Sequence, residues 1–293
     1  MPTSIVVEPP RLTDPDDAYA NGAHVAASGA IVGRWPGRAN AFRDRMLAEG
    51  RARLDAAYGP HERERLDWFL PERSAAPGGE APLGIAVFVH GGYWMRFAAG
   101  DFSHLAAGAV DRGWLTVLPS YPLCPEAALG EIADSIRRAV IAAAELADGP
   151  IRLAGHSAGA QLVTRLLCDD MALPADVVAR LDCTLSISGV HDLLPLLATS
   201  MNETLQLDRR AALAESPARH LPRQEFLERM RVCAWVGGDE RPEFIRQNGL
   251  LDIWRGVGAR VSTHVEPGRH HFDVIDDLVR SASPMLDWWL GDD

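Results

Sequence analysis

The sequence predicts an α/β fold in which helices cover both faces of a mainly parallel central sheet, preceded by a helical N-terminal extension. From residue 83 onward, short, continuously apolar runs alternate with longer segments whose apolar residues recur at helical spacing. Runs without polar alternation are typical of parallel strands that are buried on both faces. Because crossovers between parallel strands are right-handed, the carboxyl ends of these strands should share one edge, where functional residues gather.

Residues 1–60 form the predicted extension, because this segment is rich in Ala, Arg and Asp and spaces its apolar residues as helices do. We expect helices over residues 14–27 and 39–57, separated by a break at Pro36-Gly37. Two arrangements stay open for this extension. It either packs on the core of the protein or forms a partial lid over the active site.

Residues 61–293 form the predicted catalytic domain, in which strands and helices alternate. The expected strands cover residues 66–70, 85–90, 114–119, 151–154, 183–188, 232–236 and 260–265. The expected helices cover residues 102–112, 127–146, 160–167, 209–215, 223–229, 242–256 and 272–290. This order indicates a sheet built from successive strand–helix units.

Length, charge and cysteine usage limit the classes of function. A chain of 293 residues can bury a sizeable core. Its formal net charge of −11 disfavours nucleic acid and anionic membranes as partners, because both repel an acidic protein. The N-terminus lacks the pattern of a signal peptide, and no apolar run approaches the length of a membrane span. Cys124, Cys168, Cys183 and Cys233 lack paired spacing, so we expect reduced thiols and a cytoplasmic location.

The pattern Gly-x-Ser-x-Gly occurs at residues 155–159, between a predicted strand and a predicted helix. In this context the serine lies on a sharp, strained turn that exposes its hydroxyl at the edge of the sheet. The same turn places the hydroxyl at the positive end of the helix dipole. A glycine–serine turn without function is the alternative interpretation. The flanking strand and helix favour Ser157 as a nucleophile.

A nucleophilic serine needs a base, and His271 is the better candidate for it. On this kind of fold the chain order is serine, acid, histidine. His271 follows the last predicted strand and directly precedes the closing apolar segment. The adjacent His270 is the second candidate, and its alternative role is that of a loop histidine.

Asp239 is the favoured acid, because it follows the predicted strand of residues 232–236 and should lie just past the sheet edge. An acid at this place orients the histidine and stabilises its protonated form. Asp192 also follows a strand, and Glu240 is adjacent to Asp239, so both stay open as alternatives.

His90-Gly91-Gly92-Tyr93-Trp94 ends a predicted buried strand. The glycines allow backbone N–H groups of Gly91 and Gly92 to stabilise a developing oxyanion, together with the N–H of Ala158. A simple strand-ending turn is the alternative.

The remaining residues of this segment receive other roles. We expect His90 to be structural and to hold the loop by hydrogen bonds. Tyr93 and Trp94 are candidates for substrate binding, although aromatic residues more often belong to the core.

Metal and nucleotide cofactors are not expected. The ten histidines include no H-E-x-x-H pattern, and His270 and His271 are adjacent rather than spaced for one helix face. The chain also lacks the glycine patterns that bind dinucleotides or phosphates.

These motifs resemble those of the α/β-hydrolase superfamily, esterase/lipase branch. The stretches that carry the resemblance are residues 155–160, 90–94 and 271–273. A narrower resemblance, to kynurenine formamidase (arylformamidase), rests on residues 187–200, 215–217, 236–244 and 271–275. The resemblance extends from about residue 58 to the closing segment. It implies the α/β-hydrolase fold, with Ser157, Asp239 and His271 as nucleophile, acid and base and with no cofactor.

The resemblance further implies a small-molecule substrate, N-formyl-L-kynurenine, which the tryptophan catabolic pathway would convert to kynurenine and formate. A carboxylesterase for short acyl or aryl esters would use the same residues, so it stays open as the alternative. A non-catalytic receptor with a hydrolase fold is a third alternative, although such receptors usually lack part of the triad. The sequence does not report the oligomeric state, so a homodimer stays open.

Overall fold

An eight-stranded sheet forms the centre of the computed structural model, which describes residues 7–8, 10–75 and 78–291. Its spatial order is β1-β2-β4-β3-β5-β6-β7-β8. The strands are β1 (Ala52–Ala57), β2 (Arg65–Phe69), β3 (Ile85–Val89), β4 (Leu115–Pro119), β5 (Ile151–His156), β6 (Leu181–Ile187), β7 (Arg231–Gly237) and β8 (Arg260–Glu266). Strand β2 pairs antiparallel with β1 and β4, and all other pairs are parallel. The predicted mainly parallel sheet is confirmed.

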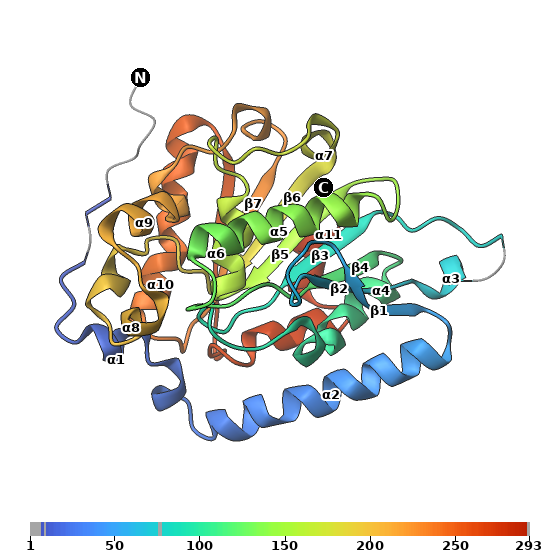
Figure 1. Ribbon diagram of the computed structural model, residues 1–293, viewed down its shortest axis with the longest axis horizontal. Coiled ribbons are helices and arrows are strands. Elements are labelled where there is room, and N and C mark those ends of the chain that lie inside the picture. The colour runs from blue at the N-terminus through green and yellow to red at the C-terminus, as the bar shows by residue number, and fades with distance from the viewer. Residues whose placement is uncertain (1–6, 9, 76–77, 292–293) are drawn as a thin grey trace.

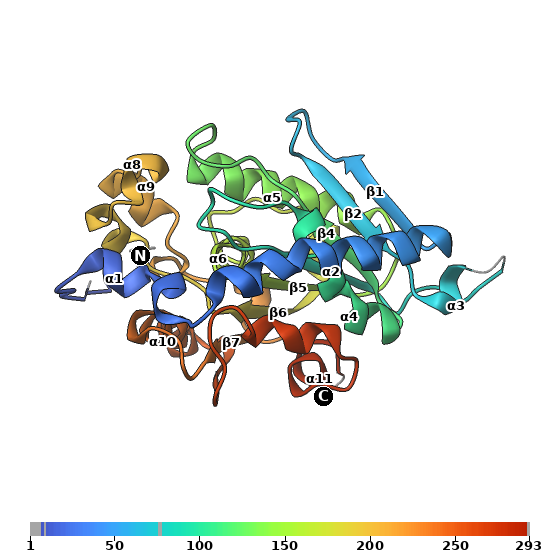
Figure 2. The same cartoon turned by 90° about the horizontal axis from the view of Figure 1, so that it is seen from below.

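Helices cover both faces of this sheet. Figure 2 shows α5 on one side of the strands and α11 on the other. The α-helices are α1 (Pro15–Tyr19), α2 (Ser28–Ala48), α3 (Glu72–Ala75), α4 (Ala107–Asp111), α5 (Leu129–Ala144), α6 (Ala158–Arg165), α7 (Ala175–Arg180), α8 (Asn202–Leu205), α9 (Arg209–Ala214), α10 (Pro242–Gly249) and α11 (Pro284–Leu290). The 3₁₀ helices are η1 (Asn21–His24), η2 (Ala99–Asp101), η3 (Ser103–Ala106), η4 (Leu194–Ala198), η5 (Pro217–Arg219), η6 (Gln224–Phe226), η7 (Leu250–Val257) and η8 (Val274–Val279).

The core consists of two apolar clusters, one on each face of the sheet. Strand β3 illustrates how one strand serves both, because its side chains alternate between the two faces. Ile85, Val87 and Val89 belong to the cluster that contains α5 and α6. Ala86 and Phe88 belong to the cluster that contains α2, α4 and α11. Burial on both faces explains why β3 reads as an unbroken apolar run in the sequence.

The N-terminal extension contains the short helices α1 and η1, followed by the long helix α2, which covers the residues where the sequence predicted a break. Helix α2 continues through Pro36, where the sequence predicted an interruption. Trp35, Ala39, Phe42 and Met46 recur at helical spacing along α2, and all four are buried. Burial of this apolar stripe against the sheet outweighs the hydrogen bond that proline removes. Figure 1 shows α2 lying along the lower side of the molecule.

The predicted helix over residues 39–57 is wrong in its last part, because β1 forms there. Strand β1 alternates half-buried and exposed residues and pairs with β2, and Ala52 lies opposite Phe69. The expected domain boundary at residue 60 therefore falls inside the β1–β2 hairpin. Residues 52–57 belong to the same sheet as the catalytic part of the chain.

Four other predicted helices are much shorter or divided, and one of them, over residues 242–256, divides into α10 and η7. Residues 102–112 form η3 followed by α4, and residues 223–229 contain only the single turn η6. Residues 272–290 divide into η8 and α11 because Ser283 and Pro284 start a new helix. The Ser283 hydroxyl accepts a hydrogen bond from Leu286 N–H at 3.2 Å, which is the usual N-cap arrangement.

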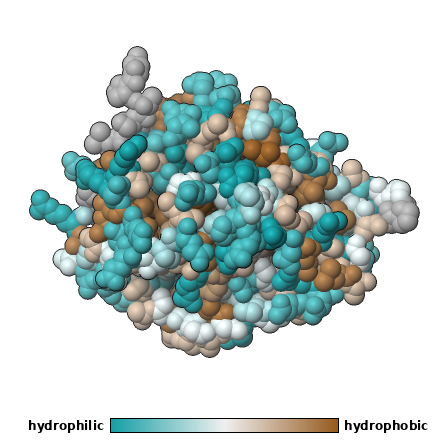
Figure 3. Space-filling model, in the orientation of Figure 1, coloured by the Kyte–Doolittle hydropathy of each residue, from teal (hydrophilic) through white to brown (hydrophobic). Residues whose placement is uncertain are grey.

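The surface carries hydrophilic and hydrophobic residues interspersed over the face shown in Figure 3. Among the described residues, no helix combines the length and the apolar character needed to cross a bilayer.

Candidate active site

Ser157 lies at the turn between β5 and α6, in a backbone conformation that residues with side chains rarely adopt. Its φ is 55° and its ψ is −116°. Close packing at the turn explains both flanking glycines. A Cβ at Gly155 would lie 2.2 Å from the carbonyl oxygen of Gly159, and a Cβ at Gly159 would lie 2.1 Å from that of Val89. The motif therefore encodes a turn that only glycine can flank.

His271 is paired with a buried carboxylate, that of Glu240. The distance from His271 Nδ1 to Glu240 Oε2 is 2.6 Å, and the two side chains are 5% and 0% exposed. The second carboxylate oxygen, Oε1, accepts hydrogen bonds from Ser188 Oγ at 2.5 Å and from Gly237 N–H at 2.8 Å. Since a carboxylate only accepts hydrogen bonds, Nδ1 of His271 carries the proton, and Nε2 is left as the basic nitrogen.

The structure corrects the choice of Asp239 as the acid. Asp239 is exposed, and its backbone N–H donates to the carbonyl oxygen of Arg269. The chain turns after β7, with Glu240 N–H donating to Gly237 O, and this turn directs Glu240 instead of Asp239 back toward the sheet edge. Glu240 was one of the two alternatives that the sequence left open.

The second alternative acid, Asp192, pairs with an arginine instead of His271. Its carboxylate is fully buried and forms an ion pair with Arg219, with Asp192 Oδ1 2.8 Å from Arg219 Nε. The alternative base, His270, contacts Asp273 instead of Glu240. His270 Nδ1 lies 3.1 Å from Asp273 Oδ1, as expected for a loop histidine.

Ser157 and His271 line the same cavity, whose volume is about 380 Å³. Aromatic side chains form part of its wall: Trp35, Phe97 and Phe272 lie along it. Trp35 comes from α2, so the N-terminal extension contributes directly to the cavity wall. The cavity thus combines a reactive corner with an apolar space that suits an aromatic group.

The three predicted oxyanion-hole residues lie around Ser157. A Cβ at Gly91 would lie 3.0 Å from Ser157 Cβ, so the loop after β3 passes directly beside the nucleophile candidate. Gly92 has a φ of 119°, a conformation that favours glycine. Ala158 is the first residue of α6, where N–H groups lack partners within the helix. Their role in stabilising an oxyanion stays a prediction.

A sequence model of the alpha/beta hydrolase family matches residues 86–293. The chain belongs to the alpha/beta hydrolase family. Kynurenine formamidase of Danio rerio is 30% identical over 236 residues, covering 77% of this hydrolase and 76% of the relative. Kynurenine formamidase of Salmo salar is 28% identical over 233 residues, with the same two coverages.

Two solved structures extend the comparison. A protein of Silicibacter sp. TM1040, described provisionally as a thioesterase, is 43% identical with a TM-score of 0.83, covering 94% of this hydrolase and 98% of that chain. Esterase B of Lactobacillus rhamnosis, crystallised with a tributyrin phosphonate inhibitor, has a TM-score of 0.65 at 13% identity. The similarity covers 90% of this hydrolase and 94% of the esterase chain. At this low identity, the second similarity concerns the fold alone.

The two aromatic residues predicted to bind substrate have different environments in the hydrolase. Tyr93 lines the cavity, and its hydroxyl donates to the Tyr19 carbonyl oxygen and accepts from Asn21 Nδ2 at 3.2 Å. Trp94 is fully buried, and its indole N–H donates to Gln161 at 2.9 Å. Trp94 does not line the cavity, so its expected role in substrate binding is wrong.

His90 has the structural role that the sequence indicated. Its ring is stacked between Phe102 and Tyr121, with centroid distances of 5.5 and 4.4 Å, and its Nδ1 donates to Gly91 O at 2.7 Å. Burial lowers the pKa of His90 to about 4, so the ring is neutral near pH 7. The side chain fixes the loop that carries Gly91.

His156 is a site residue that the sequence analysis missed. It lines the cavity, and its Nε2 lies 3.0 Å from the backbone carbonyl oxygen of His271. Burial, aided by the neighbouring His271, lowers the pKa of His156 well below its usual value, so a neutral ring donates this hydrogen bond. His156 therefore holds the loop of the catalytic histidine candidate, a role that no spacing rule in the sequence reveals.

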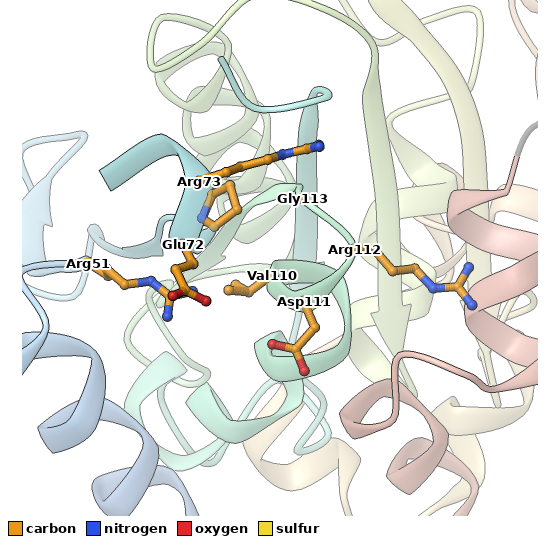
Figure 4. A pocket seen from close by; sticks show the side chains of 8 residues that line it. Arg51, Glu72, Arg73, Val110, Asp111, Arg112 and Gly113 are labelled. Carbon is orange, nitrogen blue, oxygen red and sulfur yellow. The ribbon is translucent and has the colours of Figure 1, made fainter. Parts of the chain in front are cut away.

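A second hollow, of about 490 Å³, lies at the other edge of the sheet, near the start of β4 (Figure 4). Arg51, Arg73 and Arg112 line it, but Figure 4 shows Arg112 pointing away from the other two. Arg51 is paired with Glu49, and Arg112 with Asp287. These arginines neither converge nor lack partners, so the hollow offers no prepared anion site.

Proposed function

We propose that the protein is a serine hydrolase that cleaves an N-formyl aryl amide, N-formyl-L-kynurenine, to kynurenine and formate. The observation that carries the proposal is the 2.6 Å contact between His271 and Glu240 in a cavity that Ser157 also lines. The similarity to kynurenine formamidases of two fishes supports the choice of substrate. The aromatic walls of the cavity suit an aryl group.

The first half-reaction forms a formyl-enzyme. Ser157 Oγ attacks the formyl carbon while His271 Nε2 accepts the hydroxyl proton. Glu240, which faces Nδ1, stabilises the imidazolium that results. The negative charge on the formyl oxygen is stabilised by N–H groups of Gly91, Gly92 and Ala158.

The second part of the cycle releases both products. His271 donates its proton from Nε2 to the arylamine nitrogen as the carbon–nitrogen bond breaks, and kynurenine leaves. Water then attacks the formyl ester on Ser157, and His271 takes a proton from this water. Return of that proton to Ser157 Oγ releases formate and restores the starting state.

The N-terminal extension contributes to the proposed specificity. Asn21, Val32 and Trp35 line the cavity, and all three precede the sheet. We propose that residues 21–35 act as a partial lid that limits the space around the substrate. A cytoplasmic location and a homodimer stay predictions from the sequence.

A carboxylesterase for short acyl or aryl esters is the competing function, because the same side chains would perform it. The 43% identical protein described provisionally as a thioesterase adds thioesters to the substrates worth testing. The decisive experiment measures kcat/KM on N-formyl-L-kynurenine, on p-nitrophenyl esters from acetate to octanoate, and on acetyl and butyryl thioesters. The proposal requires the formamide to give the highest kcat/KM. Turnover of esters or thioesters without turnover of the formamide would contradict it.

A further inference from the structure

Among residues 7–8, 10–75 and 78–291, Arg96 is the one residue with a permanent charge that lines the cavity beside Ser157. The other cavity-lining residues are aromatic, aliphatic, glycine or neutral polar residues, apart from His156 and His271. Arg96 is exposed, so it lies where the cavity meets solvent. A cation at this place is unexpected on grounds of average charge, because the whole chain carries −11.

Arg96 has no acidic partner among residues 7–8, 10–75 and 78–291. Its guanidinium lies over the ring of Phe97, with Cζ 4.9 Å from the ring centroid. Phe97 is itself part of the cavity wall. The contact holds the guanidinium against the wall without neutralising it, which leaves its N–H groups available to an anion.

The backbone of Arg96 is close to the reactive corner of the cavity. A Cβ at Gly92 would lie 2.5 Å from the Arg96 carbonyl oxygen, and the neighbouring Gly91 packs against Ser157. Arg96 therefore belongs to the same tight turn that presents the oxyanion-hole candidates. Arg96 and Ser157 line one cavity, so a substrate that fills this cavity lies beside both residues.

We propose that Arg96 binds a carboxylate on the substrate. It thereby selects aryl formamides that carry an α-amino-acid group over aryl formamides without a carboxylate. Guanidinium and carboxylate form paired, charge-assisted hydrogen bonds, which are stronger and more directional than neutral ones. The choice of formamide rests on the proposed function, whereas carboxylate binding by Arg96 depends only on the cavity.

The test compares two substrates that differ in the amino-acid group that carries this carboxylate. N-formyl-L-kynurenine carries it, and 2-formamidoacetophenone has the same aryl ketone without the amino-acid group. In Arg96→Gln, the ratio of kcat/KM for the first to that for the second should fall about 10- to 100-fold, as expected for loss of a hydrogen bond to a charged group. Most of the change should appear in KM, because the carboxylate is bound equally in the ground and transition states. Arg96→Lys should restore part of the ratio.

Arg34→Gln is the matched control, since Arg34 is an exposed arginine between two cavity-lining residues of α2 but does not line the cavity. It removes the same charge, so a ratio that falls equally in Arg34→Gln and Arg96→Gln would overturn the proposal. An unchanged ratio in Arg96→Gln would also overturn it.

A second measurement separates this inference from the proposed function. L-kynurenine and 2-aminoacetophenone are tested as inhibitors of p-nitrophenyl acetate hydrolysis. Weaker inhibition by L-kynurenine alone in Arg96→Gln supports carboxylate binding even if neither formamide is hydrolysed. Equal inhibition of the wild type and Arg96→Gln by L-kynurenine contradicts carboxylate binding even if N-formyl-L-kynurenine is a good substrate.

Discussion

Replacing Glu240 by glutamine keeps the shape of the side chain but exchanges one carboxylate oxygen for an NH₂ group. The structure determines which way the new amide faces. The Oε1 position receives two donors, Ser188 Oγ at 2.5 Å and Gly237 N–H at 2.8 Å. The backbone N–H of Gly237 can only donate, so the amide oxygen takes this position. The NH₂ group then faces His271 Nδ1.

An NH₂ group at this place reverses the tautomer of His271. Nδ1 must accept a hydrogen bond, so the proton moves to Nε2, the nitrogen that should receive the proton of Ser157. In a serine protease, the same exchange of acid for amide lowers kcat about 10⁴-fold. We therefore expect Glu240→Gln to lose activity by about that factor while keeping its fold.

The matched control is Asp239→Asn, since Asp239 is adjacent in sequence and exposed. Steady-state kinetics on N-formyl-L-kynurenine and on p-nitrophenyl acetate should show kcat within about twofold of the wild type for Asp239→Asn, as for most surface substitutions. Circular dichroism and thermal unfolding of both variants confirm that the comparison concerns folded enzymes. A 10³-fold or larger loss in Asp239→Asn, with Glu240→Gln near wild type, would refute the assignment of the acid.

Three further predictions concern stability. Gly159→Ala should lower the free energy of unfolding by about 1–3 kcal/mol, measured in urea, because its Cβ would lie 2.1 Å from Val89 O; an unchanged midpoint would contradict this. Arg219→Met should cost about 3–5 kcal/mol by leaving Asp192 buried without a partner, and adding Asp192→Leu should recover part of the loss if the ion pair is the cause. Burial lowers the pKa of His191 from 6.5 to about 3, so the unfolded chain binds a proton that the folded protein does not, and stability falls as pH drops from 6.5 toward 3. In His191→Gln, the slope of the free energy of unfolding against pH should be smaller by about 1.4 kcal/mol per pH unit between pH 3 and 6.5. Equal slopes in the variant and the wild type would contradict this prediction.

The strands and the strained turn at Ser157 could be predicted because their signals are local. A strand buried on both faces favours an unbroken apolar run, as in β3, whose sequence is Ile-Ala-Val-Phe-Val. The turn at Ser157 needs small residues at Gly155 and Gly159, because backbone atoms occupy the space of any Cβ. Both requirements restrict the residue types at fixed positions, so they can be recognised in the sequence.

The N-terminal region could not be predicted correctly because distant contacts decide its structure. Ala52–Ala57 has residues that favour helices, yet it becomes a strand because β2 offers it an edge to pair with. Pro36 does not end α2, because the buried Trp35 and Phe42 keep the helix on the core. Local propensity is a weak guide where tertiary packing contributes more free energy.

The acid illustrates a limit at the level of one residue. Asp239 and Glu240 are neighbours in a turn, and the turn alone decides which carboxylate returns to the sheet edge. Arg96 was missed for a related reason. Its value as a binding residue depends on Phe97 and on the neutral walls of the cavity, neither of which has a characteristic spacing.

The central claim is that Ser157 carries out the hydrolysis of an aryl formamide. The most direct test is the rate of formate release from N-formyl-L-kynurenine by the wild type and by Ser157→Ala at saturating substrate. We expect the substitution to lower kcat by at least about 10⁴-fold, because removing the nucleophile of such a triad leaves only binding and the oxyanion hole. Formate release by Ser157→Ala within about tenfold of the wild-type rate would contradict the account, because the nucleophile would then have to be another group.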